Sequence, residues 1–164
     1  MMLNLLVKSL RFNVLMVALM LSSAGYAATY YIAPTGSDAA SGSSSDPFKT
    51  IAKAASLVLP GDIVLVSGGT YGERNIIPGS AGSAAAMIVF KPNPGTGDVI
   101  IKHPSIGLSD NTPIFNLANR SFIRVEGFQF KDFQYGKASV YISTRQGNVV
   151  INNRFENLGN GEVT

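Results

Sequence analysis

The hydrophobic and polar positions between Tyr30 and Tyr71 predict a short strand, a polar loop, an amphipathic helix, a turn and a second strand. The helix rests on apolar residues that recur at steps of three and four positions, which is the helical period: Phe48, Ile51, Ala55 and Val58. Ser45 or Asp46 is expected to cap this helix, with Pro47 at its first position, where a missing N–H costs nothing.

Pro60-Gly61 is expected to end the helix, and Asp62–Val66 follows as a strand whose Val and Ile residues are typical of burial on both faces. A turn is predicted at Gly68-Gly69. Beyond it, short apolar segments separated by turns predict strands only: 75–77, 87–90, 99–101, 114–117, 122–125, 128–130, 140–142 and 149–151. The sequence therefore predicts an all-β chain with a single helix near its start.

Apolar segments also repeat at a nearly constant spacing. Val149–Ile151 follows Ile123–Val125 by 26 residues, and aligning Val125 with Ile151 and Phe130 with Phe155 requires one deleted residue. This spacing fits one coil of a β-solenoid, in which parallel strands stack and each coil covers the apolar face of its neighbour. An antiparallel sandwich explains the density of strands equally well, but it does not explain the offset.

The first 27 residues have the pattern of a secretory signal peptide. Lys8 and Arg11 form a basic start, Phe12–Leu21 is an almost wholly apolar run, and small residues follow, placed for cleavage after Ala27. A membrane anchor is the alternative, but a span needs about 20 apolar residues. We therefore expect an exported protein without a stable membrane anchor, folded as one domain over residues 28–164.

Composition excludes several classes of function. Without Lys8 and Arg11 the chain holds 11 basic and 10 acidic residues, a net charge of +1, so no nucleic-acid partner is expected. The absence of cysteine excludes disulfides, a thiol nucleophile and thiolate metal sites. Seventeen glycines fit a turn-rich β chain, and the low charged fraction argues against disorder.

The segments YYIAPTGSD, DPFKTIAKA and PGDIVLVSGGTY resemble the N-terminal cap of secreted right-handed parallel β-helix proteins of the polysaccharide lyase type. The phrases AAAMIVFKP, RSFIRVEGFQFKDF and NVVINNRFENLG resemble their coils. The resemblance implies that the helix covers the first coil and protects its open edge. The chain ends at Thr164 without a comparable unit, so we expect a front portion of a longer protein, with a natural stop on a partner chain as the alternative.

The resemblance also implies a chemistry, because lyases of this kind cleave uronic-acid polymers by β-elimination. A cation, often calcium, neutralises the sugar carboxylate, and a Lys or Arg removes the neighbouring proton. Calcium takes six to eight oxygen ligands, whereas the carboxylates of the later chain are scattered: Asp98, Asp110, Glu126, Asp132 and Glu156. No catalytic residue and no cofactor can be assigned in this chain, although calcium remains possible for the whole protein.

Weak candidates for contact with an acidic polymer are the later basic residues and one tyrosine: Lys131, Tyr135, Lys137, Arg145 and Arg154. Solvated coil edges are the simpler explanation for the charges. If Phe130 stacks on Phe155, Lys131 forms a surface ion pair with Glu156. Tyr141 either stacks on sugar rings or belongs partly to the core.

Three further positions are expected to serve the structure. Asn152-Asn153 suits a turn, where Asn tolerates left-handed backbone, and Glu73 is placed to hold a coil corner. His103 is the only histidine, so neither a zinc motif nor a catalytic triad is indicated. The pair of carboxyls that a glycosidase needs cannot be found from the sequence.

Together these features predict the front part of an exported β-helix lyase acting on an acidic polysaccharide. The fragment alone is expected to be inactive, and the full-length protein to be a monomer. A non-catalytic carbohydrate-binding or adhesin β-helix is the first alternative, and a β-helical glycoside hydrolase is the second.

Overall fold

The computed structural model describes residues 26–104, 112–132, 139–143 and 145–156. These residues form one helix, α2 (Ile51–Leu57), and strands that lie in three parallel sheets. The first sheet has the order β1 (Thr29–Ile32), β2 (Ile63–Val66), β4 (Ile88–Pro92), β7 (Ile123–Glu126) and β10 (Val149–Ile151). The second contains β3 (Gly69–Gly72), β5 (Val99–Lys102), β8 (Gln129–Lys131) and β11 (Arg154–Glu156). The third pairs β6 (Phe115–Asn116) with β9 (Val140–Tyr141).

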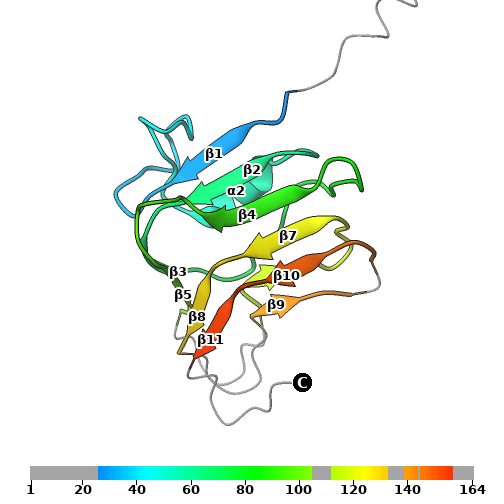
Figure 1. Cartoon of the computed structure of the whole chain (residues 1–164). Helices are drawn as coiled ribbons and strands as arrows, with labels where there is room; N and C mark the ends of the chain where they lie inside the picture. Colours follow the sequence, from blue (N-terminus) through cyan, green and yellow to red (C-terminus); the bar gives the residue numbers. More distant parts are fainter. Residues whose placement is uncertain (1–25, 105–111, 133–138, 144, 157–164) are drawn as a thin grey trace, which may run out of the picture.

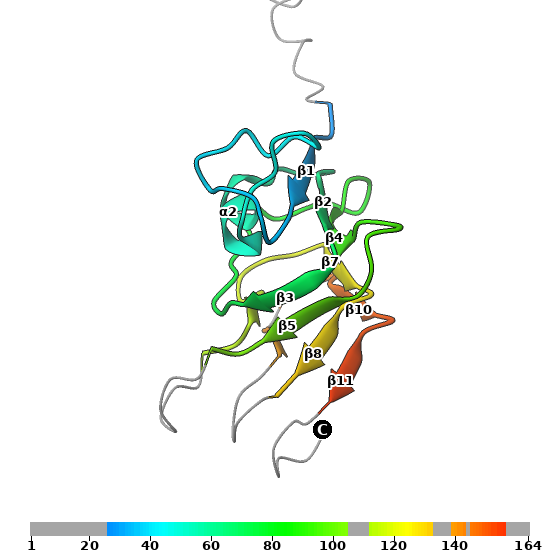
Figure 2. The ribbon, with the colours of Figure 1, turned by 90° about the vertical axis from the view of Figure 1, so that its left-hand side faces the viewer.

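Successive strands of each sheet come from successive coils, so the chain winds as a parallel β-helix. Figure 1 shows β1, β2, β4, β7 and β10 stacked as the rungs of one face, and Figure 2 shows β3, β5, β8 and β11 stacked on the next. Every strand pair that the structure describes is parallel. The predicted parallel β-helix is thereby confirmed, and the antiparallel sandwich is excluded.

The register differs from the predicted one by a residue in one place. Phe155 pairs with Phe130, as expected, but Val125 pairs with Val150 and not with Ile151, which lies beside Glu126. The two coils therefore align without the deletion that the sequence comparison introduced. Val149, Val150 and Ile151 are all apolar, so the sequence alone did not exclude an alignment shifted by one residue. Such a shift would turn the inward residues of β10 to the outside.

The core consists of inward-facing side chains stacked in columns. One column runs through Val64, Phe90 and Val125, and another through Tyr71, Ile101 and Phe130, all of them buried. Phe115 lies between these columns, with its ring centroid 5.4 Å from that of Phe90 and 6.4 Å from that of Phe130. Each coil thus buries apolar surface that it could not bury alone.

Helix α2 lies beside β1 at one end of the stack (Figure 2). In the chain it follows β1 at the point where, in later coils, a strand of the second sheet follows a strand of the first. Phe48, Ile51, Ala55 and Val58, the predicted cap residues, are all buried there, as an inward-facing apolar stripe requires. Phe48, however, precedes the helix and forms a β-bridge with Ile32. The expected start of the helix was therefore wrong, because the residues around Pro47 bond to β1 and Thr50 is the N-cap.

Two carboxylates hold this end together by accepting hydrogen bonds from the backbone that leads into α2. Asp38 accepts from the N–H groups of Lys49 and Thr50, and Glu73, just after β3, accepts from those of Ile51 and Ala52. Burial raises the pKa of Glu73 although these N–H donors oppose the shift. Glu73 therefore fastens the helix to the first coil, as its expected corner role suggested.

Gly68-Gly69 was predicted as a turn, but Gly69 is the first residue of β3. A Cβ at Gly69 would lie 2.5 Å from the ring of Pro34, so only glycine fits beneath the loop above it. The predicted strand at 75–77 is reduced to a single bridge between Ile76 and Phe115.

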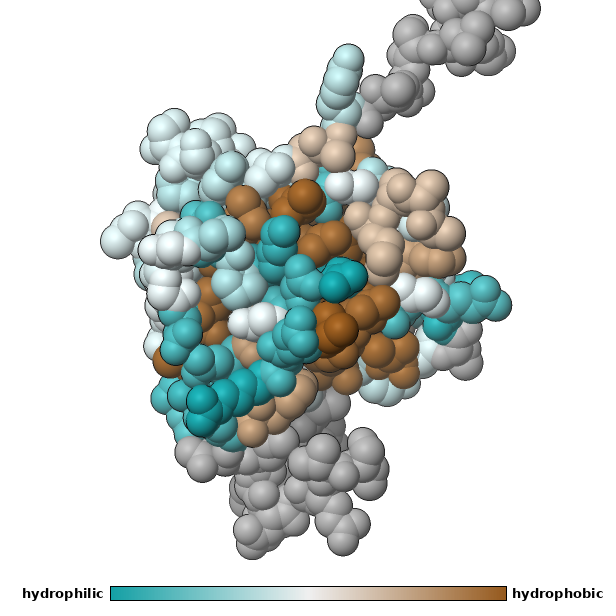
Figure 3. Space-filling view, in the orientation of Figure 1, coloured by the Kyte–Doolittle hydropathy of each residue, from teal (hydrophilic) through white to brown (hydrophobic). Residues whose placement is uncertain are grey.

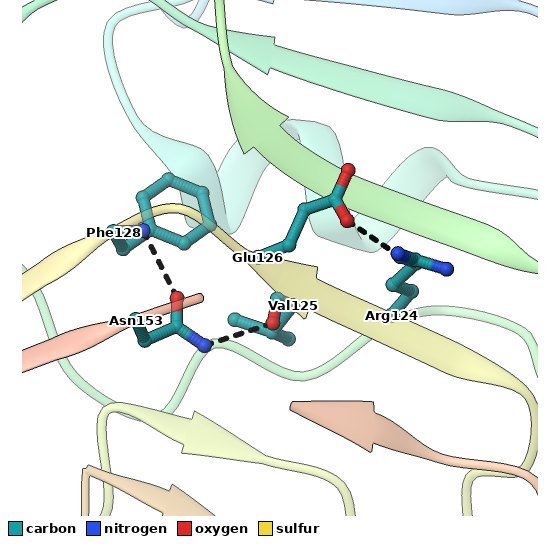
Figure 4. A network of polar contacts seen from close by, with 5 residues as sticks. All are labelled: Arg124, Val125, Glu126, Phe128 and Asn153. Atoms are coloured by element: carbon teal, nitrogen blue, oxygen red, sulfur yellow. Dashed lines mark hydrogen bonds and ion pairs between the residues drawn. The ribbon is translucent and has the colours of Figure 1, made fainter. Parts of the chain in front are cut away.

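Asparagine side chains take the place of backbone bonds at the corners between sheets. Asn153 accepts from the N–H of Phe128 at 2.9 Å and donates to the carbonyl of Val125 at 2.9 Å (Figure 4). Its neighbour Asn152 has a positive φ of 57° and follows Gly127, with φ 78°, by one coil. The predicted structural role of Asn152-Asn153 is therefore confirmed.

Candidate functional site

The outward face of the second sheet carries two of the predicted basic candidates, Lys131 and Arg154, and there each cation has a carboxylate partner. Lys131 lies 2.9 Å from Glu156 on the next coil, which confirms the predicted ion pair. Lys102 lies 2.5 Å from Asp132, and Arg154 also contacts Glu156. This face therefore carries alternating, mutually neutralised charges.

Hydrogen bonding from Lys131, with a further contribution from the charge of Arg154, lowers the pKa of Glu156 below its ordinary value. Glu156 thus stays ionised and paired with Lys131 and Arg154. A polyanion would have to compete with it for Lys131 and for Arg154. The ion-paired face is consequently a poor binding surface for an acidic polymer.

The predicted candidates Tyr135 and Lys137 lie outside the described residues, as does Asp110. Arg145 is exposed and lies away from the ion-paired face, in the corner between β9 and β10. Its guanidinium donates to the side-chain oxygen of Asn119 at 3.5 Å.

Arg120 occupies the same place one coil earlier, in the corner between β6 and β7. Its Nε donates to the carbonyl of Pro78. Sequence reasoning missed this residue, although its separation of 25 residues from Arg145 equals the length of a coil here, as the bond between Asn153 and Phe128 shows. Within the part of the chain that the structure describes, neither guanidinium has a carboxylate within ion-pair distance.

The third sheet, next to this corner, presents Asn116 and Tyr141 side by side on its outward face. Phe115 and Val140 point inward from the same two strands, so alternation directs Asn116 and Tyr141 to the outside. Tyr141 is 47% exposed. Of the two predicted roles for Tyr141, the structure therefore favours an accessible ring over a place in the core.

The outward face of the first sheet is mixed in polarity. Figure 3 shows hydrophobic and hydrophilic side chains next to one another on this side of the molecule. Arg124 and Glu126 on β7 form an ion pair at 2.6 Å (Figure 4), while Leu65 and Val89 on earlier rungs are partly covered. No continuous charged or apolar strip marks this face as a site.

Metal chemistry finds no support in the described ranges. No three His, Asp or Glu side chains there gather closely enough to hold an ion, so the residues in view do not form a calcium site. His103 is buried, with its ring nitrogens 2.9 and 3.0 Å from the carbonyl oxygens of Pro104 and Thr112, which gives it a structural role. Among the described residues, no helix has the length and apolar character required to cross a membrane.

Comparison with known proteins places these features in context. Residues 34–77 match a family described as a protein of unknown function, DUF1565. The chain is 26% identical over 127 residues to the uncharacterized protein YwoF of Bacillus subtilis, a match that covers 74% of this chain and 27% of YwoF. The chain thus spans about a quarter of the length of that relative.

Two solved structures share the fold. A rhamnogalacturonan lyase superposes with a TM-score of 0.56 at 24% identity, over 76% of this chain and 34% of the lyase. A GH136 lacto-N-biosidase from Eubacterium ramulus superposes with a TM-score of 0.54 at 18% identity, over 79% of this chain and 26% of that enzyme. Likeness at these identities extends to the fold, and it agrees with the parallel β-helix seen here.

Proposed function

We propose that this chain belongs to an exported protein that binds an acidic polysaccharide and cleaves it by a lyase reaction. The fold supports this proposal because a rhamnogalacturonan lyase and a lacto-N-biosidase, both named for carbohydrates, share this architecture. The N-terminal leader, with Lys8, Arg11 and the apolar run up to Leu21, supports export.

The observation that carries the proposal is the exposed ring of Tyr141 on the third sheet, beside Asn116. An aromatic ring offers a flat apolar surface for the C–H face of a sugar. The amide of Asn116 donates to Asn75 and accepts from the N–H of Ala118, which leaves one N–H and one lone pair for hydroxyl groups. Parallel coils repeat at a spacing of about 4.8 Å. They therefore present such side chains in a row along which an extended polymer can lie.

In the proposed elimination, a base removes the proton from the carbon next to the sugar carboxylate. The electron pair forms a carbon–carbon double bond, the neighbouring carbon–oxygen bond breaks, and the leaving oxygen takes a proton. The described residues position and bind the polymer in this scheme. We place the base that starts the reaction outside the described residues, so the 164-residue chain alone is expected to bind without cleaving.

A non-catalytic binding protein is the second candidate. The ion-paired face favours it because the cations there cannot serve as the base of a lyase. Lys131 and Arg154 are basic residues of the later coils, and both are held by Glu156. In that arrangement neither is available as a base.

The test is to mix the purified protein, and a longer form that continues through the following coils, with polygalacturonate, alginate and neutral galactan. Binding is measured by affinity electrophoresis, and elimination by the ultraviolet absorbance of the unsaturated product. Retardation by the acidic polymers alone, with new absorbance for the longer form, supports the lyase. Binding without absorbance by either form supports the binding protein, and no binding to either acidic polymer contradicts both.

A further inference from the structure

Two arginines occupy equivalent positions at the corners of successive coils. Arg120 comes four residues after Asn116 and Arg145 comes four residues after Tyr141, so the two are equivalent residues of adjacent coils. Each reaches back to the corner before it, Arg120 to the carbonyl of Pro78 and Arg145 to the side chain of Asn119. The two guanidinium groups are therefore held at the same corner, at the spacing of neighbouring coils.

Stacked like charges repel, and elsewhere this protein neutralises them. Lys102 and Lys131 are also paired in register on adjacent coils, but Asp132 and Glu156 lie 2.5 and 2.9 Å from them, respectively. The described part of the chain supplies no such partner for Arg120 or Arg145. Like charges placed opposite one another destabilise a sheet, so an uncompensated pair is the arrangement expected of a site that receives an anion.

We propose that Arg120 and Arg145 bind the carboxylate of a sugar acid in the polymer, beside Tyr141. This inference rests on the proposed function and identifies residues that carry it. A guanidinium matches the planar carboxylate with two parallel hydrogen bonds, and two guanidiniums on adjacent coils can contact one carboxylate or two along the chain.

The proposal is tested with the trimer of galacturonic acid, titrated against the protein by calorimetry at low ionic strength. Arg145→Gln removes one guanidinium and is expected to weaken binding by roughly tenfold or more. Arg154→Gln is the matched control, because Arg154 is exposed and already engaged with Glu156, and its affinity should equal that of the wild type. Added salt should weaken the wild type more than Arg145→Gln.

Arg120 needs a variant that keeps its charge, since its Nε serves the backbone at Pro78. Arg120→Lys should retain the fold, checked by circular dichroism, and still weaken binding because the two-point geometry is lost. Equal affinity for Arg145→Gln and the wild type overturns the assignment while leaving the proposed function intact. If the wild type binds neither the trimer nor polygalacturonate, the assignment and the function fail together. If the wild type binds a sulfated trimer but not the uronate, the carboxylate assignment is wrong.

A second inference comes from the start of the folded body. Asp62 is 3% exposed and accepts hydrogen bonds from the N–H groups of Ala28 at 2.7 Å and Leu59 at 2.8 Å. Equivalent positions directly before later strands carry asparagine: Asn148 accepts from the N–H of Ile123 and Asn153 from that of Phe128. A neutral amide is sufficient at those corners, whereas Asp62 accepts with both of its oxygens. Among the described residues, no basic side chain lies within ion-pair distance to offset the charge of this buried carboxylate.

We infer that cleavage after Ala27 turns the nitrogen of Ala28 into the terminal ammonium group and that Asp62 is its partner. Cleavage at the predicted site creates a positively charged amino group, which is the partner that the buried carboxylate lacks. Ala27 and Tyr26 are exposed, and Ala28 is the first residue tied to the body through Asp62 and through a bond from the N–H of Ile63. Removal of the leader and completion of the first coil would then be one event.

The test compares protein that begins at Ala28 with protein that carries an extra Gly-Ser before it, each with Asp62 and with Asp62→Asn. The free terminus should raise Tm by roughly 2–8 °C over the extended form. That difference should disappear in the Asp62→Asn pair, because the amide cannot pair with the ammonium. An equal Tm for both forms, or a difference that survives in Asp62→Asn, contradicts the inference. So does exported protein whose mass shows cleavage elsewhere.

Discussion

Asn153 repeats the hydrogen bonds of Asn148, one corner further along the chain. Each side-chain oxygen accepts from an N–H that lies 25 residues earlier, and each side-chain nitrogen donates to a carbonyl 28 residues earlier. The two asparagines thus join one coil to the previous one at points where the backbone turns and cannot bond directly. Their amides replace ladder hydrogen bonds that the bend would otherwise leave unmade.

Replacing Asn153 with alanine should therefore destabilise the protein. The substitution leaves the N–H of Phe128 and the carbonyl of Val125 without their partner. An unsatisfied buried group costs about 1–3 kcal/mol, so the free energy of unfolding, measured by urea denaturation, should fall by that amount.

Asn152 provides the control for this experiment, because it is exposed and contributes its backbone conformation, with φ of 57°. Asn152→Gly should leave stability within about 0.5 kcal/mol of the wild type, since glycine adopts positive φ without strain. If Asn152→Gly costs as much as Asn153→Ala, the amide bonds are not what stabilises this corner.

Phe130 and Phe155 stack with ring centroids 5.2 Å apart and an angle of 11° between the rings, but their burial differs. Phe130 is fully buried, whereas Phe155, on the last described coil, is 42% exposed. Phe130→Ala should cost about 3–5 kcal/mol of unfolding free energy, and Phe155→Ala only about 1–2 kcal/mol because less apolar surface leaves water. Equal costs would mean that the last described coil is covered in solution.

The repeat could be predicted from sequence because solenoid coils carry apolar residues at matching positions. Phe130 and Phe155 fixed the register at one corner, since large aromatic side chains tolerate no other alignment. The neighbouring strand offered Val149, Val150 and Ile151 in a row, and three similar side chains cannot show which of them points inward. The one-residue error arose there.

The helix start and the candidate site were less predictable for different reasons. Pro47 looks like a first helical residue, but Ser37 and Gly42 bond to the backbone around it and hold it in the loop. Arg120 has no motif of its own and becomes visible only when coils are aligned with Arg145. Ion pairs such as that of Lys131 with Glu156 follow from register, so this one was predictable once Phe130 and Phe155 had been matched.

The helix that covers the first coil should be essential for solubility. Ile51, the first residue of α2, is fully buried, and Ile51→Asp would place a charge among apolar side chains. The end of the coil would then be exposed, with its unpaired strand edge, and the protein should aggregate in size-exclusion chromatography. Ser56→Asp, on the exposed side of the same helix, should remain soluble. A soluble, normally folded Ile51→Asp protein would contradict the covering role.

The loop that precedes α2 should make stability depend on acid pH through Asp38. Burial alone would raise the pKa of Asp38, but hydrogen bonds from Thr50 and Lys49 outweigh it and lower the pKa below the ordinary value of 3.8. The ionised carboxylate therefore stabilises the fold above that pH, and this contribution is lost as the pH falls through the lower, folded-state pKa. Denaturation curves of the wild type and Asp38→Asn between roughly pH 2 and pH 6 test this directly. The stability advantage of the wild type should be constant at the upper end and shrink toward the lower end. The charge of Asp38 contributes to the raised pKa of Glu73, so both proteins are compared in a Glu73→Gln background, which removes that titration. Parallel curves over the whole range would show that Asp38 does not hold this loop.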